Sequence, residues 1–170
     1  MAIFRIIFYT IRKVIVKMLT NKIFNYQFMP EYAKLFLPAD IQEEDILFFD
    51  IETTGLSHRN SRVYLIGAAL CAEGKWEMIQ FLAQEESEEE ERAVLEAFQS
   101  LCAQKRCFVH FNGSTFDIPY LQHKYQSCRL TAPFTDAVSI DLYRILQPFR
   151  PLLQTPNFRQ KSLEPLAGYK

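Results

Sequence analysis

The sequence predicts an α/β domain with a mixed β-sheet, and three observations support this fold class. Strand-like and helix-like segments alternate along most of the chain, as expected for a sheet flanked by helices. Residues 62–70 and 75–82 are strand-like and are joined by the short turn Glu73-Gly74, which indicates an antiparallel hairpin. Helical segments separate the later strands, which is typical of parallel crossovers. The 170 residues, of which 49% are apolar, suit one folded domain and exclude a disordered chain.

The first strands follow from short apolar segments bounded by turn residues. The sequence DILFFD at residues 45–50 is a nearly continuous apolar run, which suits a strand buried on both faces. The turn-rich sequence GLSHRN follows at residues 55–60, and the two hairpin strands come next. We therefore expect the first three strands of the domain to pair antiparallel.

Residues 85–91 contain six glutamates and precede the first predicted helix. Ser87 suits the N-cap position, and glutamates in the first turn complement the helix macrodipole. Apolar side chains follow at i, i+4, i+7 and i+8, and they are Val94, Phe98, Leu101 and Cys102. We interpret the acidic run as a helix start, and an acidic interaction patch is the alternative.

The second half of the chain repeats the alternation of strands and helices. Residues 106–111 form an apolar strand that Asn112-Gly113-Ser114 ends, and a helix is expected to begin at Ser114 or Thr115. A short strand, a helix, an irregular proline-containing stretch and a last helical segment are expected at 138–141, 142–146, 148–156 and 162–170.

Residues 1–40 are interpreted as a basic amphipathic segment and linker that precede a domain at residues 41–170. Basic residues interrupt the apolar stretch at its start, so it is neither a membrane-spanning helix nor a signal peptide. Residues 1–22 could lie on a membrane surface, pack as an ordinary helix, or be a non-native extension, in which case Met18 is the true start.

The charge is distributed unevenly, although the net charge is only −1. Residues 1–37, 38–100 and 101–170 carry net charges of +5, −11 and +5, so a basic groove can exist within a nearly neutral chain. The four cysteines lack zinc-ligand spacing, and no secretory segment precedes them. They are expected to be small buried thiols of a cytoplasmic protein.

Asp50 and Glu52 stand at the end of the first predicted strand. Because side chains alternate along a strand, both carboxylates point to the same face of the sheet. Two carboxylates held together repel each other and are costly to desolvate, and a divalent cation such as Mg²⁺ or Mn²⁺ relieves this cost. The alternative is a solvated strand end with two ordinary acids, although the tight turn at Thr53-Thr54-Gly55 leaves backbone free to approach a ligand.

A third acid, Asp117, falls in the first turn of the helix that follows Asn112. Alone, Asp117 could simply stabilise the helix N-terminus, and Asn112 could be an ordinary turn residue. DIETTGL at 50–56 and NGSTFD at 112–117 together resemble two motifs of the DEDD, or DnaQ-like, superfamily of 3′–5′ exonucleases, which have the ribonuclease H-like fold. The further sequences VYLIG, IDLYR and SLEPLAG make the chain similar to YprB-type ribonuclease H-like proteins.

The resemblance implies hydrolysis of phosphodiesters with two divalent metal ions, Mg²⁺ or Mn²⁺, at the ends of single-stranded DNA or RNA. It implies that Asp50 bridges both metals, that Glu52 binds the metal on the side of the attacking water, and that Asp117 holds the second metal. The terminal nucleotide and the strand would be contacted by Thr53, Thr54, Gly55, Leu56 and Asn112.

Other polar residues receive structural interpretations. Asp141 precedes a helix and is interpreted as its N-cap rather than as a residue at the site's edge. The three histidines, His58, His110 and His123, are interpreted as structural or incidental, although His58 is close enough to the predicted site to meet a phosphate.

The pattern of the superfamily is incomplete here. After Asp141 the only acidic residue is Glu164, so the final Asp and the Tyr or His that orients the water are missing. We expect a domain truncated at its C-terminus, with a non-catalytic nucleic-acid-binding domain or completion by another chain as alternatives.

A glycosidase fits poorly, because Asp50 and Glu52 share one face instead of flanking a sugar. The motifs do not choose between DNA and RNA.

Overall fold

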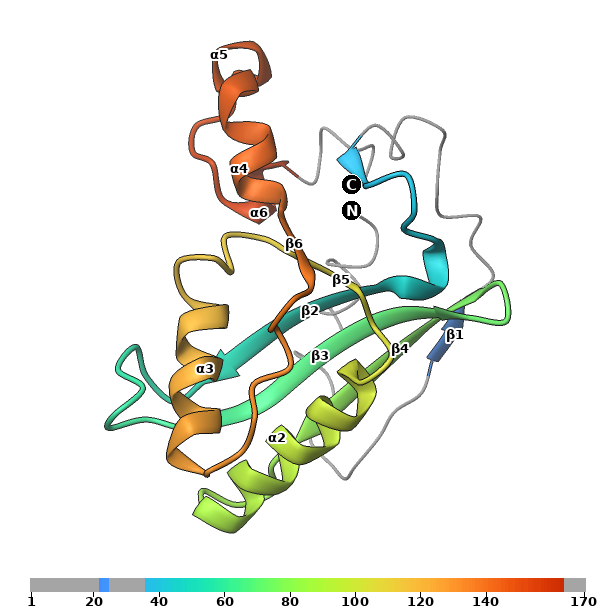
Figure 1. Ribbon diagram of the computed structural model, residues 1–170. Helices are drawn as coiled ribbons and strands as arrows, with labels where there is room; N and C mark the ends of the chain where they lie inside the picture. Colours follow the sequence, from blue (N-terminus) through green and yellow to red (C-terminus); the bar gives the residue numbers. More distant parts are fainter. Residues whose placement is uncertain (1–21, 25–35, 164–170) are drawn as a thin grey trace.

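The computed structural model describes residues 22–24 and 36–163, which form one six-stranded mixed β-sheet with helices around it (Figure 1). The strands, in their spatial order, are β1 (Lys22–Phe24), β4 (Lys75–Leu82), β3 (Val63–Ala72), β2 (Ile46–Thr53), β5 (Cys107–His110) and β6 (Val138–Asp141). The helices are α2 (Glu88–Cys102), α3 (Asp117–Ser127), α4 (Leu142–Leu146), α5 (Arg150–Leu153) and α6 (Gln160–Leu163). Two short 3-10 helices are η2 (Glu43–Asp45) and η3 (Gln147–Phe149).

Strand pairing confirms the predicted mixed sheet. β2 pairs antiparallel with β3, and β3 pairs antiparallel with β4. β5 is parallel to β2, and β6 is parallel to β5. β1, which pairs antiparallel with β4 at the edge of the sheet, was not predicted from the sequence. The division into residues 1–40 and 41–170 stays a prediction.

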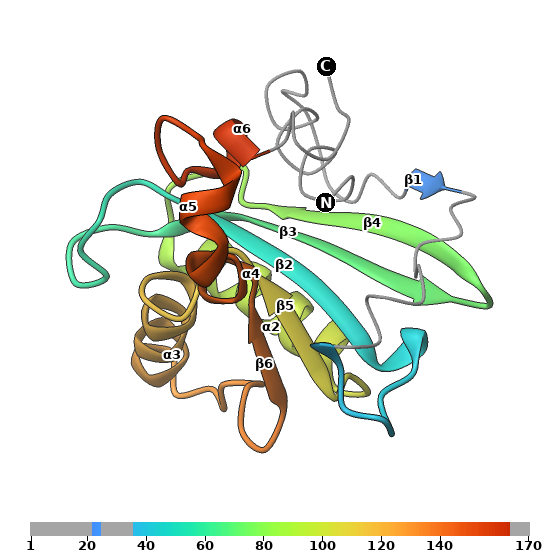
Figure 2. The same ribbon diagram turned by 90° about the horizontal axis from the view of Figure 1, so that it is seen from above.

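The sheet buries both of its faces because side chains alternate along each strand. From β2, Phe49 enters the core that α2 and α3 cover, whereas Phe48 enters a second core on the opposite face. Figure 2 shows α2 and α3 on the same side of the sheet. Burial of one such side chain contributes about 1.5–3 kcal/mol. Asp50 and Glu52 follow Phe48 by two and four residues, so their side chains point to the same face as Phe48. Both carboxylates therefore lie on the face opposite α2 and α3.

Helix α2 begins as predicted. The Ser87 hydroxyl oxygen accepts a hydrogen bond from the Glu90 N–H at 3.1 Å, which confirms Ser87 as the N-cap. The predicted apolar face packs inward, although Leu101 is only half-buried. The acidic run is not uniformly solvated, because the Glu91 side chain is buried against α3.

Several element bounds differ from those predicted. β2 continues to Thr53, three residues beyond the predicted end, because Ile51, Glu52 and Thr53 still pair with β3. α3 begins at Asp117 rather than at Ser114 or Thr115, since a turn occupies the residues between β5 and the helix. The stretch predicted as irregular, 148–156, contains α5 and part of η3.

Some predictions lie outside the described residues. These are the basic amphipathic segment up to residue 21, the start at Met18, most of the linker and the segment with Glu164. Among the described helices, none combines the length and the apolar character that crossing a bilayer requires.

Candidate active site

Asp50 and Glu52 lie in the second half of β2, where β3 is the strand that pairs with it. In the register with β3, Asp50 is opposite Gly67 and Glu52 is opposite Leu65. β5 pairs with β2 only at residues 46–48, the first three residues of β2. β5 therefore ends before it reaches the two acids. Beside Asp50 and Glu52, the backbone of β2 on the side of β5 is therefore free to bond another group.

Asp117 occupies that open side. Its Oδ1 accepts a hydrogen bond from the backbone N–H of Ile51, at 3.3 Å. Ile51 is the residue between Asp50 and Glu52, so this bond brings the start of α3 against the strand that carries both predicted ligands. Asp117 is 6% exposed, which makes it the most buried of the three acids. The structure thus brings together the residues that the two motifs predicted.

The three acids oppose one another's ionisation. Burial, followed by the charges of Asp117 and Glu52, raises the pKa of Asp50 well above its usual value. Burial raises the pKa of Asp117 to about 6, with added repulsion from Asp141 and Glu52, against the hydrogen bond from Ile51. Burial also raises the pKa of Glu52. The site therefore concentrates negative charge that the described residues leave without compensation.

The donor set fits a hard divalent cation. Carboxylate oxygens are the preferred ligands of Mg²⁺ and Mn²⁺, and a cation would relieve the repulsion that raises the pKa of Asp50. Within residues 22–24 and 36–163, no three acidic, histidine or cysteine side chains already stand in an arrangement that could hold a metal ion. The assignment of the three carboxylates as metal ligands therefore stays a prediction.

The turn after β2 presents the residues predicted to meet the terminal nucleotide. The Thr53 hydroxyl donates to the Gly55 carbonyl at 2.9 Å, and the Thr54 hydroxyl accepts from the Arg62 N–H at 2.9 Å. Leu56 is 88% exposed, which is unusual for a large apolar side chain in this protein. This exposed side chain, in the turn that follows Asp50 and Glu52 along the chain, is free to contact another molecule.

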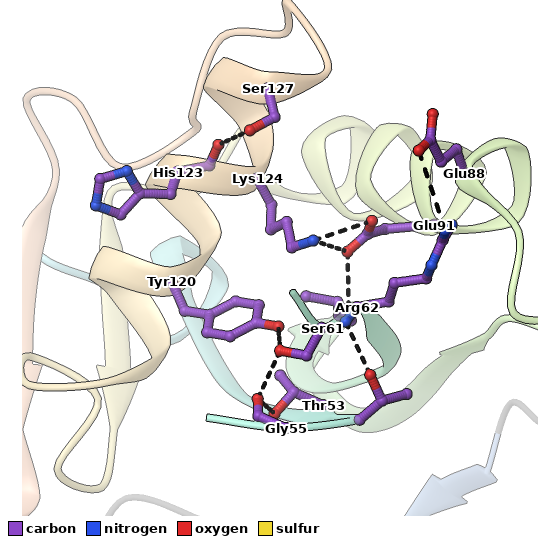
Figure 3. A network of polar contacts seen from close by, with 12 residues as sticks. Thr53, Gly55, Ser61, Arg62, Glu88, Glu91, Tyr120, His123, Lys124 and Ser127 are labelled. Carbon is purple, nitrogen blue, oxygen red and sulfur yellow. Dashed lines mark hydrogen bonds and ion pairs between the residues drawn. The ribbon is translucent and has the colours of Figure 1, made fainter. Parts of the chain in front are cut away.

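Ser61 holds this turn in place (Figure 3). Its hydroxyl lies within hydrogen-bonding distance of the carbonyl oxygens of Gly55 and Ser57, at 2.8 and 2.7 Å. It also lies 2.6 Å from the Tyr120 hydroxyl of α3. A Cβ at Gly55 would lie 3.2 Å from the Ser61 Cβ, so a larger residue would crowd this contact. The turn and α3 are therefore fixed relative to each other through Ser61.

Asp141 confirms its predicted role as N-cap of α4 and adds a second role that the sequence analysis missed. Its Oδ1 accepts the N–H groups of Tyr143 at 3.1 Å and Asn112 at 2.8 Å, and its Oδ2 accepts the Ser114 N–H at 3.2 Å. Asn112 has a left-handed backbone with φ 62°, which asparagine tolerates well. Burial alone would raise the pKa of Asp141, but hydrogen bonds from the Ser114 side chain and from the backbone N–H groups of Asn112 and Ser114 outweigh it and lower the pKa.

His110 packs against Gly113 in the same turn. It is 1% exposed, and its Nε2 lies 2.9 Å from the Ser139 hydroxyl. A Cβ at Gly113 would lie 2.8 Å from the His110 ring, so glycine is needed there. Burial lowers the pKa of His110, which keeps the ring neutral. The structural interpretation of this histidine fits its contacts.

His58 and His123 form a pair that sequence reasoning did not predict. Their rings stack with centroids 3.8 Å apart and an angle of 6° between the planes. One ring comes from the loop between β2 and β3 and the other from α3, and residues so far apart in the chain give no local signal of contact.

The sheet order, and the acids that gather where β2 meets the start of α3, define an α/β fold of the ribonuclease H type. The family model described as RNase_H superfamily matches residues 47–169, and the chain belongs to this family. The ribonuclease H-like superfamily and fold, which the two motifs suggested, are confirmed.

Solved structures share the fold at low sequence identity. Exonuclease I in its apo form aligns with a TM-score of 0.57 and 18% identity, over 76% of this chain and 38% of that chain. E. coli exonuclease I in complex with a dT13 oligonucleotide aligns with a TM-score of 0.56 and 17% identity, over 74% and 36%. A family B DNA polymerase from the hyperthermophilic archaeon Pyrobaculum calidifontis gives 0.51 and 20%, over 61% and 16%. None of the curated proteins matches the sequence.

Proposed function

We propose that this domain hydrolyses phosphodiester bonds at the 3′ ends of single-stranded DNA or RNA, with Mg²⁺ or Mn²⁺ as cofactor. One observation carries the proposal. The Asp117 carboxylate bonds the N–H of Ile51, between Asp50 and Glu52, so three acids share one end of the central strand. Such unpaired, buried acids are costly for stability and are typical of metal-dependent sites.

In this mechanism Asp50, Glu52 and Asp117 would hold two ions. When bound, such ions would supply activation of a water molecule and stabilisation of the charge on the phosphate. The chain's own residues position the strand. Leu56 packs against the terminal base. Asn112, whose backbone Asp141 fixes, contacts the strand beside α3.

The partner is proposed to be a single strand. Exonuclease I, which shares the fold, has been solved with a dT13 oligonucleotide, and this supports a strand partner for the present chain. A membrane surface bound by residues 1–22 is the less favoured partner. We also propose a cytoplasmic location, which is supported by four cysteines that are all free thiols.

A second candidate function is binding of a single strand without hydrolysis. It is favoured by the absence, within the described residues, of three side chains already arranged to hold a metal ion. The two candidates differ in one measurable property, because only the first consumes the strand.

The test is degradation of single-stranded DNA and RNA labelled at the 5′ end, with Mg²⁺, Mn²⁺ or EDTA. We expect the wild type to shorten a strand only with metal, and Asp50→Asn to lower the rate by more than about 100-fold. Asp136→Asn is the matched control, because Asp136 is exposed and has a left-handed backbone that asparagine also accepts.

Equal activity of Asp50→Asn and Asp136→Asn would contradict the site assignment. Binding of the strand by the wild type with no shortening under any metal would instead favour the second function.

A further inference from the structure

A cavity of about 740 Å³ lies between the loop that joins β2 to β3, the start of α2 and the second half of α3. It is lined by residues 58–62 of the loop, by Glu88 and Glu91 of α2, by residues 123, 124, 126 and 127 of α3, and by Cys128 just after α3. Its volume is in the range of small-ligand sites. The proposed metal ligands are not among the lining residues, so the cavity is separate from the candidate active site.

One acid in the cavity is already neutralised. Glu91 Oε1 lies 3.1 Å from Lys124 Nζ, and both side chains are at least 90% buried. The same oxygen accepts the Val63 N–H at 2.8 Å (Figure 3). Glu91 is therefore occupied by the packing of α2, β3 and α3, and it has little capacity left for the other cations of the cavity.

Arg62 has unused hydrogen-bonding capacity. Its Nη1 is buried and donates to no group among the described residues. The nearest acid, Glu88, is 4.0 Å from its Nη2 and has a side chain that is 88% exposed. A buried guanidinium N–H without an acceptor is costly, and an anionic ligand would satisfy it.

One further lining residue, Arg59, adds to the positive charge of the cavity. Arg59 is exposed and forms no ion pair within the described part of the chain. The stacked rings of His58 and His123 lie beside it. Partial burial, together with the charges of His123, Arg59 and Lys124, lowers the pKa of His58. Several cationic or protonatable groups thus share a cavity in which one of the two acids is already paired.

We propose that this cavity binds a phosphate group of the single strand on which the candidate active site acts, through Arg59 and Arg62. The inference rests on the proposed function. The Thr53–Leu56 turn and the two arginines belong to the same connection between β2 and β3. The carboxylates lie on the face of the sheet opposite α2 and α3, so a strand that passes around this connection can contact both sites. Ser61, between the arginines in sequence, hydrogen-bonds toward the turn and toward α3, so the two sites keep a fixed relation.

The test measures the affinity of a fluorescent single strand by polarisation, in EDTA, over a series of salt concentrations. EDTA prevents metal-dependent hydrolysis and keeps divalent cations away from the stacked histidines. We expect Arg59→Gln and Arg62→Gln each to weaken binding about tenfold and to reduce the slope of log affinity against log salt by about 0.7. Lys75→Gln is the control, because it also removes one positive charge but begins β4 next to the β3–β4 turn, at the other end of β3 from the cavity.

The outcomes separate the two proposals. If the wild type binds the strand and both arginine variants match Lys75→Gln, the phosphate site is wrong and the proposed function is unaffected. If the wild type neither binds nor degrades any strand, the proposed function fails. Titration with inorganic phosphate, followed through the imidazole signals of His58 and His123 by NMR, distinguishes a site for any free phosphate from one that requires a strand. Shifts with phosphate but no loss of strand affinity in the arginine variants would overturn the inference.

Discussion

Asp117→Asn should stabilise the metal-free protein at neutral pH. The substitution removes one of the repelling charges, while its side-chain oxygen can still accept the Ile51 N–H. Burial raises the pKa of Asp117 from 3.8 to about 6 in the folded state. A folded-state pKa above the unfolded value means that the stabilising contribution is complete below the unfolded pKa and is lost as the pH rises through the folded pKa. At 1.36 kcal/mol per pKa unit, the loss is at most about 3 kcal/mol.

The assay is urea unfolding of the wild type and of Asp117→Asn in EDTA, from about pH 4 to about pH 8. We expect the two free energies of unfolding to converge near about pH 4, the advantage of the variant to grow as the pH rises from about 4 to about 6, and the difference to stay constant at higher pH. Asp136→Asn, in which an exposed acid is replaced, should show no such divergence. A difference between Asp117→Asn and the wild type that does not change with pH, or a wild type that gains stability over the variant on going to neutral pH, would refute the reasoning.

Three further predictions concern stability. Mg²⁺ or Mn²⁺ at 100 times Kd should stabilise the folded wild type by about 2.7 kcal/mol, which calorimetry would record as a higher thermal midpoint. The rise should be smaller in Asp50→Asn, and no rise with either ion would count against the metal site. Glu91→Gln should cost about 3–5 kcal/mol in urea unfolding because it leaves the Lys124 charge buried without its partner, and Lys124→Met in the same chain should restore part of the loss. Ser87→Ala should cost about 1 kcal/mol, and an unchanged midpoint would show that the N-cap bond contributes little.

Much of the fold could be predicted because its signals are local. The hairpin of β3 and β4 follows from Glu73-Gly74, and both residues have positive φ angles in the structure, as a tight hairpin turn requires. The start of α2 follows from Ser87 and the glutamates after it. The end of β2 could not be predicted in this way, because DIET is polar and its strand conformation comes from pairing with β3. β1 was missed for the same reason, since three residues carry no periodicity and are placed by β4.

In the candidate site, too, the residues with local sequence signals could be predicted, and those placed by tertiary packing could not. Asp50, Glu52 and Asp117 were predicted from short motifs, and the bond from Ile51 shows that the fold does bring them together. The stacked histidines and the cavity around Arg62 depend on the packing of a loop against two helices. The chain separates His58 from His123 by more than sixty residues, so neither residue alone indicates the other.

Asp141 and Asp117 show how structural and functional acids can be told apart in this domain. The two residues are equally buried, at 6% exposure, and both stand next to a helix start. Asp141 accepts three backbone N–H groups, and its pKa is lowered. Asp117 accepts one bond from β2 and faces other carboxylates, and its pKa is raised to about 6. Hydrogen bonds therefore stabilise the charge of Asp141, whereas burial dominates at Asp117 and leaves its charge uncompensated. The uncompensated acid is the one whose charge a cation would stabilise, which is why we assign Asp117, rather than Asp141, to the proposed metal site with Asp50 and Glu52.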